Sequence, residues 1–217
     1  MKKYTILFDL DGTIIDSTPA ILRGFSYAFN KFGLSTPPHE KILSLIGHPL
    51  DFMFTHLGIK EDVEKFVDAY KEHYRVIAKD FTTLLPGAKE AVQEAVTFAN
   101  LAVVTTKTGV YSIELLQHLG LMDCFEVVIG RENVIHPKPH PEPLLKAMHI
   151  LQAHKEYTFM IGDTCLDMEA AKAAEVKGVG VLCGYGNKEE LQRCAHWLKK
   201  DAFEAVLFIK KLSKSNN

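Results

Sequence analysis

Short apolar runs alternate with helical patterns along most of this chain, and this alternation restricts the folds that it can adopt. Each run has the length of a buried strand and carries few polar residues, which is typical of a sheet covered on both faces. Strands separated by helices favour a parallel sheet with right-handed crossovers. The predicted strands are residues 4–8, 101–104, 126–129, 157–161 and 178–182, and the helices between them are 88–98, 110–119, 141–151 and 166–174.

Residues 16–81 interrupt this alternation, because they contain no good strand and carry helical patterns at residues 21–32 and 63–77. The run Ser17-Thr18-Pro19 is typical of a helix start, with the Ser17 hydroxyl as the expected cap and proline in the first turn. Asp16 is expected to act as a cap or a hinge residue. The sequence therefore predicts an α/β core of residues 1–15 and 82–217 with an inserted helical domain of residues 16–81.

Charge and composition exclude several classes of protein. The formal net charge is −2 over 217 residues, which argues against a nucleic-acid or membrane surface. No apolar run approaches the roughly 18 residues of a membrane span, and no secretory leader is evident, so a cytoplasmic protein is expected. The four cysteines form no C-x-x-C pair, and free thiols are expected at Cys124, Cys165, Cys183 and Cys194.

Residues with catalytic chemistry follow the predicted strands. Asp9 and Asp11 follow the first strand, Thr105 and Thr106 the second, and Asp163 with Asp167 the fourth, while Lys138 lies in a proline-rich loop. Ligands of open parallel sheets bind outside the carboxyl ends of the strands, so these groups should converge although about 150 residues separate them.

The expected set combines carboxylates, one ammonium and several hydroxyl groups. Carboxylates hold Mg²⁺, which prefers oxygen ligands and often bridges to phosphate. Lys138, Thr105 and Thr106 suit a dianionic phosphoryl group, and Gly12 allows a tight backbone path beside it. If Asp9 attacks phosphorus, Asp11 can protonate the leaving oxygen and later deprotonate water.

These residues resemble the four motifs of the haloacid dehalogenase superfamily. The run from Asp9 to Asp16 is similar to motif I, Thr105 to motif II, Lys138 to motif III, and Asp163 with Asp167 to motif IV. The resemblance covers nearly the whole chain, and the phosphoglycolate phosphatase-like enzymes are the most similar subgroup. It implies a Rossmann-like core, an aspartyl-phosphate intermediate, a helical cap over the site, and Mg²⁺ bound by Asp9, Asp11 and Asp163 with Asp167 in support.

The sequence departs from the family pattern at two positions. Many relatives have Asn where this chain has Thr106, which can still hydrogen-bond phosphate. Relatives often have Gly at the position of Glu175, where a positive φ would strain Glu by roughly 1 kcal/mol. The resemblance also makes His48 a candidate specificity residue, because it lies in the predicted cap, within the segment 44–50. Zinc bound by His136 and His140 is disfavoured, since no further ligand has the usual spacing.

The leading functional hypothesis is Mg²⁺-dependent hydrolysis of a small phosphomonoester, such as phosphoglycolate or a sugar phosphate, by a monomer or homodimer. Inorganic pyrophosphatase activity and phosphoglucomutase-like phosphotransfer use the same groups and stay open. Dehalogenase chemistry is disfavoured because dehalogenases of the superfamily lack the equivalent of Asp11. A binding protein without activity is disfavoured because Asp9, Asp11, Lys138 and Asp163 are all present.

Overall fold

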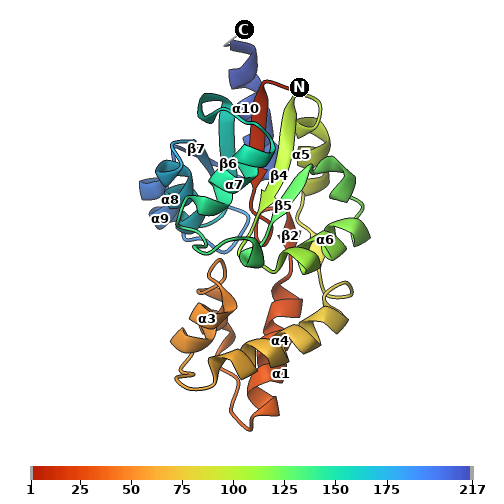
Figure 1. Cartoon of the computed structure of the whole chain (residues 1–217), viewed down its shortest axis with the longest axis vertical. Coiled ribbons are helices and arrows are strands. Elements are labelled where there is room, and N and C mark those ends of the chain that lie inside the picture. Colours follow the sequence, from red (N-terminus) through yellow and green to blue (C-terminus); the bar gives the residue numbers. More distant parts are fainter. Residues whose placement is uncertain (1, 216–217) are drawn as a thin grey trace.

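A six-stranded parallel sheet forms the centre of the structure, a computed structural model that describes residues 2–215 (Figure 1). Its strand order is β5-β4-β1-β6-β7-β8, and every neighbouring pair is parallel. The strands are β1 (Tyr4–Phe8), β4 (Ala99–Val104), β5 (Val127–Ile129), β6 (Thr158–Gly162), β7 (Lys177–Val181) and β8 (Trp197–Lys199). The predicted α/β class and five predicted strands are confirmed, whereas the edge strand β8 was not predicted.

Helices cover both faces of this sheet, as the side chains of β1 demonstrate. Ile6 and Phe8 pack in one apolar cluster with helices α5, α6 and α10, while Leu7 packs in a second cluster with α7 and α8. This alternation is the period of two that a fully buried strand requires. The helices are α5 (Ala88–Ala95), α6 (Gly109–His118), α7 (Glu142–Ile150), α8 (Cys165–Ala173), α9 (Lys188–Cys194) and α10 (Ala202–Ser215). Short 3-10 turns are η1 (Met122–Cys124), η2 (Arg131–Asn133) and η3 (Lys155–Tyr157).

Four of the five helices between β1 and β4 form a separate layer beyond the carboxyl ends of the strands (Figure 1). They are α1 (Thr18–Lys31), α2 (His39–Leu43), α3 (Leu50–His56) and α4 (Val63–Ile77). Helices α1 and α4 pack closely, because Gly24 leaves room for the Tyr70 ring and a Cβ there would lie 2.6 Å from it. Phe25, Phe54 and Tyr70 form the aromatic centre of this layer. A helical insertion after β1 agrees with the prediction, while its boundaries at residues 16 and 81 stay a prediction.

A two-stranded antiparallel ribbon lies where the chain enters and leaves the insertion. It pairs β2 (Ile15–Asp16) with β3 (Thr83–Leu84). Ser17 is the N-cap residue of α1 and proline follows in the first turn, as expected, but the Ser17 hydroxyl donates to Asp11 and does not cap the helix. Asp16 Oδ1 accepts from the Thr18 amide at 2.9 Å, so Asp16 bonds the first residue of α1.

The cysteine expectation was also wrong for one pair. Cys165, the first residue of α8, and Cys194, the last residue of α9, form a disulfide with their Cα atoms 5.9 Å apart. Cys124 and Cys183 are free thiols, as predicted. The pair was missed because its partners lie 29 residues apart in the sequence and meet only through the packing of α8 against α9. No helix within residues 2–215 is both long and apolar enough to cross a bilayer.

Candidate active site

Lys138 lies at the centre of a buried cluster at the carboxyl ends of β1, β4 and β6. Its ammonium donates to Asp9 Oδ1 at 2.7 Å, to Asp167 Oδ1 at 2.5 Å and to the carbonyl of Val104 at 2.9 Å. Burial works against the charge of Lys138, but Asp167 and Asp9 outweigh it, so the pKa of Lys138 is raised. Lys138, the residue that resembles motif III, therefore bonds directly to Asp9 in the segment that resembles motif I.

Asp9 and Asp163 are buried carboxylates whose pKa values are both raised. Burial raises the pKa of Asp9 to about 7, against the opposing effect of Lys138. Asp163 accepts from the Tyr185 amide at 2.7 Å and the Thr13 hydroxyl at 3.1 Å, and neither donor is charged. Burial, together with the charges of Asp9 and Asp167, raises the pKa of Asp163 well above its ordinary value.

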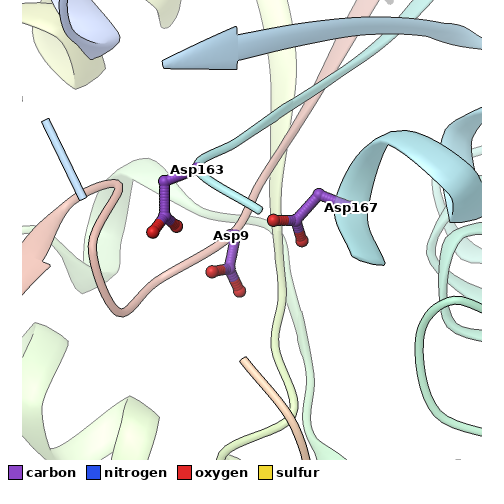
Figure 2. Close-up of side chains that lie close together, drawn as sticks. All are labelled: Asp9, Asp163 and Asp167. Carbon is purple, nitrogen blue, oxygen red and sulfur yellow. The ribbon is translucent and has the colours of Figure 1, made fainter. Parts of the chain in front are cut away.

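Three carboxylates converge on one point in this cluster. Oxygens of Asp9, Asp163 and Asp167 all lie within 4.8 Å of one another, and the three side chains point toward the same space (Figure 2). The surrounding protein supplies one ammonium, that of Lys138, for these three negative charges. A divalent cation would neutralise the excess, so the donor set fits Mg²⁺, which favours carboxylate oxygens.

The three carboxylates differ in their availability to a metal. Both oxygens of Asp167 are occupied, since Oδ1 accepts from Lys138 while Oδ2 accepts from the Thr164 amide at 3.1 Å and the Thr164 hydroxyl at 2.8 Å. Thr164 is the N-cap residue of α8, and Asp163 directly precedes it. Each oxygen of Asp163 also accepts one bond, but from a neutral donor, whereas Asp167 accepts three bonds, one of them from the Lys138 ammonium. Asp9 and Asp163 are therefore the carboxylates better placed to bind a cation, and Asp167 holds Lys138.

The loop after β1 approaches Asp163 closely through a glycine. Gly12 has φ +81°, and a Cβ there would lie 2.4 Å from Asp163 Oδ2. A side chain would therefore collide with the carboxylate cluster as well as strain the backbone. The tight backbone path expected at Gly12 is present in the structure, while its phosphate contact stays a prediction.

The two threonines after β4 point in different directions. Thr105 is buried, and its hydroxyl accepts from the Lys107 amide at 3.1 Å. The Thr106 hydroxyl instead donates to the carbonyl of Gly47 at 2.9 Å, which joins the core to the loop before α3. Next to that contact, His48 is half-buried and stacks on Phe52 with ring centroids 4.1 Å apart. Burial, aided by His56, lowers the pKa of His48.

Asp11 has partners that sequence reasoning missed. One carboxylate oxygen accepts from the Ser17 hydroxyl, and the other lies 3.2 Å from the ammonium of Lys107. Lys107 in turn donates to the Tyr74 hydroxyl at 3.0 Å. Lys107 could have been identified as a site residue from the sequence, because it directly follows Thr106 at the end of a predicted strand. Tyr74 could not, because it belongs to the apolar face of α4 and resembles an ordinary core residue.

A cavity of about 370 Å³ opens beside Asp11, between the helical insertion and the core loops. Lys107, Thr106 and His48 contribute polar groups to its wall. Its apolar wall includes Ile21, Phe25, Ile46, Leu50, Met53 and Val67, and its charged groups further include Asp51, Glu64, Asp68, Lys71 and Arg131. The cavity therefore joins an apolar surface to the Asp11 carboxylate.

Comparison with known proteins agrees with this geometry. The family described as haloacid dehalogenase-like hydrolase matches residues 6–181, which include every carboxylate and ammonium of the cluster. The chain is a haloacid dehalogenase-like hydrolase. The predicted superfamily and the predicted hydrolase class are thereby confirmed.

Individual relatives of this haloacid dehalogenase-like hydrolase cover almost its full length. It is 33% identical over 196 residues to "Pyrophosphatase PpaX" of Anoxybacillus flavithermus, covering 88% of this chain and 89% of the relative. It is 31% identical over 212 residues to "Probable phosphatase IndB" of Dickeya dadantii, covering 94% and 92%. A crystal structure of a haloacid dehalogenase-like hydrolase from Bacteroides fragilis superposes with a TM-score of 0.88 at 29% identity, covering 94% of this chain and all of the other.

Proposed function

We propose that this hydrolase is a Mg²⁺-dependent phosphatase that acts through an aspartyl-phosphate on Asp9. The observation that carries the proposal is the buried pair Asp9 and Asp163, whose negative charge exceeds what Lys138 neutralises. Relatives named as a phosphatase and a pyrophosphatase support the same class of reaction.

The metal would be held by the carboxylates of Asp9 and Asp163 and the backbone carbonyl of Asp11. When bound, Mg²⁺ supplies positive charge that offsets the negative charge of a phosphoryl group beside these carboxylates. Lys138, fixed by Asp167 and Val104, presents its ammonium on the same side as Asp9 Oδ1. The Thr105 hydroxyl, which accepts from the Lys107 amide and keeps its own proton, completes the group that binds phosphate, whereas the Gly12 amide already donates to the carbonyl of Ile15 at 2.9 Å.

The chain's own residues carry the two chemical steps. In the first, a carboxylate oxygen of Asp9 forms a bond to phosphorus, the bond from phosphorus to the leaving oxygen breaks, and Asp11 gives its proton to that oxygen. In the second, water forms a bond to phosphorus, the bond to Asp9 breaks, and Asp11 takes the proton from the water. Inorganic phosphate leaves, and both carboxyl groups return to their starting states.

A small organic phosphomonoester is the substrate that the cavity favours. The volume of about 370 Å³ and the apolar wall formed by α1, α4 and the loop before α3 suit an organic leaving group. Pyrophosphate is the second candidate, favoured by the name of the Anoxybacillus relative. Measuring phosphate release from a panel of organic monoesters and from pyrophosphate, each with Mg²⁺, distinguishes the two candidate substrates. A higher kcat/KM for pyrophosphate than for every ester would contradict the choice of an organic phosphomonoester.

The nucleophile is tested by Asp9→Asn. The amide cannot form the aspartyl-phosphate, so turnover should be lost while circular dichroism shows an unchanged fold. Wild-type protein quenched in acid during turnover should carry one phosphoryl group by mass spectrometry, and the variant should carry none. Steady-state hydrolysis by Asp9→Asn, free of wild-type contamination, would rule out the covalent route.

A further inference from the structure

The carboxylate of Asp11 is held from both sides by groups that lead to the helical insertion. Ser17, which holds one oxygen, directly precedes α1. Lys107, which lies 3.2 Å from the other oxygen, donates to the hydroxyl of Tyr74 on α4. The orientation of Asp11 therefore depends on contacts to α1 and α4 as well as on the core.

Lys107 is built into this position rather than free in solvent. Its side chain is 9% exposed, and its ammonium lies 4.5 Å from the centroid of the Tyr74 ring in addition to bonding the Tyr74 hydroxyl. Lys107 therefore acts as a fixed link between Asp11 and α4.

We propose that Lys107 is a positioning residue that sets the orientation of Asp11, and that Tyr74 holds Lys107 in place from the helical insertion. The proposal rests on the proposed role of Asp11 as the group that protonates the leaving oxygen. Movement of α4 away from the core would remove Tyr74 from Lys107, and Lys107 would then no longer fix the carboxylate. Asp11 is therefore oriented for proton transfer to the leaving group only while the insertion is packed against the core.

The kinetic test compares two substrates that differ mainly in their need for an acid. Phenyl phosphate and p-nitrophenyl phosphate have similar shapes, but the nitrophenolate leaves readily without a proton. We expect Lys107→Met to lower kcat/KM for phenyl phosphate at least about tenfold more than for p-nitrophenyl phosphate, because kcat/KM reports the step in which the leaving group departs. Tyr74→Phe should also lower kcat/KM more for phenyl phosphate than for p-nitrophenyl phosphate. The difference should be smaller than in Lys107→Met, because this change removes the hydroxyl and keeps the ring.

Lys79→Met is the matched control. Lys79 also joins the insertion to the core, through Glu114 of α6 at 3.5 Å, but it has no contact with Asp11. It should affect both substrates equally. Equal losses for the two substrates in Lys107→Met and in Tyr74→Phe would show that Lys107 is merely structural and would overturn the proposal.

A measurement without turnover separates this proposal from the proposed function. Crystal structures of wild type, Tyr74→Phe and Lys107→Met should show the Asp11 carboxylate rotated away from its wild-type position in Lys107→Met. An unmoved carboxylate overturns the positioning role. Wild-type protein that hydrolyses neither aryl phosphate nor any ester of the panel with Mg²⁺ instead overturns the phosphatase assignment, and the orientation of Asp11 in the variants still decides the role of Lys107.

Discussion

Asp163 is a fully buried carboxylate whose nearest charges are two other carboxylates, Asp9 and Asp167. Its two hydrogen-bond donors, Thr13 and the Tyr185 amide, are neutral. In the protein without metal, this crowding of negative charge opposes folding, because each carboxylate raises the cost of ionising the others. A bound cation would attract these carboxylates, so that their negative charges would favour the folded state.

Asp163→Asn should therefore stabilise the metal-free protein and remove its response to Mg²⁺. We expect the variant to have a higher Tm than wild type in EDTA at pH 8, and Mg²⁺ to raise the Tm of wild type only. Thermal unfolding followed by circular dichroism measures both effects, with the exposed Asp123→Asn as the control. A variant that Mg²⁺ stabilises as strongly as wild type would place the metal elsewhere.

The pH dependence of metal-free stability follows from Asp9. Its pKa is about 7 in the folded protein against an ordinary value of 3.8, so between these values the folded state binds a proton that the unfolded state has lost. The contribution of Asp9 to the free energy of unfolding therefore falls as pH rises from about 4 to about 7. Denaturant titrations in EDTA at pH 5 and pH 8 should show this fall in wild type, reduced in Asp9→Asn.

His48 should affect which substrate is preferred, whereas Lys138 should affect all substrates. His48 lines the cavity beside Asp11, and Lys138 contacts Asp9, the proposed nucleophile. We expect Lys138→Ala to lower kcat/KM for every phosphoester, and His48→Ala to change their ranking, measured over one panel. Should His48→Ala keep the whole panel within about twofold of wild type, His48 is an ordinary residue stacked on Phe52.

Sequence reasoning located the strand-end residues better than their partners. Asp9, Lys138 and Asp163 could be predicted to converge because parallel strands end at one edge of a sheet. The link from Lys107 to Tyr74 could not, because apolar periodicity identifies Tyr74 as a core residue and says nothing about its hydroxyl. The bond from the Ser17 hydroxyl to Asp11 could not be predicted either, because a helix cap and this bond need the same residue type.

At the scale of elements, the turn from α8 to β7 contains a strained residue. Glu175 has φ +60°, the left-handed conformation that favours glycine, as was predicted if the helix ended there. Its side chain forms an exposed ion pair with Lys155, which contributes little. The strain is therefore largely uncompensated.

Glu175→Gly should stabilise the protein by roughly 1 kcal/mol, because glycine adopts positive φ without the Cβ penalty. Glu169→Gly is the matched control: the same change at an exposed position inside α8 should destabilise by roughly 1 kcal/mol. Urea unfolding at a fixed pH measures both differences. Loss of stability in both variants would show that the turn is relaxed with Glu175.

Sequence patterns missed several short elements and one long helix. Strand β8 is the three residues Trp197–Lys199 at the edge of the sheet, and α2 has only five residues. Neither is long enough to show the period of its structure, and their form depends on neighbours such as β7 and α1. The 14-residue helix α10 was also not predicted, whereas α1, α4, α5, α6, α7 and α8 were predicted to within a few residues.

At the scale of the whole molecule, the disulfide between α8 and α9 is a cross-link that local sequence could not reveal. Cys165 and Cys194 close a loop with a separation of 29 residues. Restricting the unfolded chain in this way stabilises the fold by roughly 3–4 kcal/mol on the loop-entropy estimate. Cys165 is also only two residues from Asp163, so the cross-link anchors the segment that carries the site.

Thiol titration checks the cross-link directly. Denatured, unreduced protein should react at two of its four cysteines, Cys124 and Cys183, and at all four after reduction. Cys194→Ser should lower the midpoint of guanidinium unfolding relative to wild type in oxidising buffer, and Cys124→Ser should leave it nearly unchanged. Four reactive thiols before reduction would contradict the pairing.

The central place of β1 has a consequence for how the protein is made. Translation produces β1 first, yet its hydrogen-bonding neighbours are β4 and β6, and β6 ends at Gly162. On the ribosome, β1 therefore stays without its second neighbouring strand until most of the chain has been synthesised. Helices α1 and α4 can pack against each other earlier. Asp9 and Asp163 meet only when β6 has docked, so an incomplete nascent chain has no reactive centre with which to consume cellular phosphoesters.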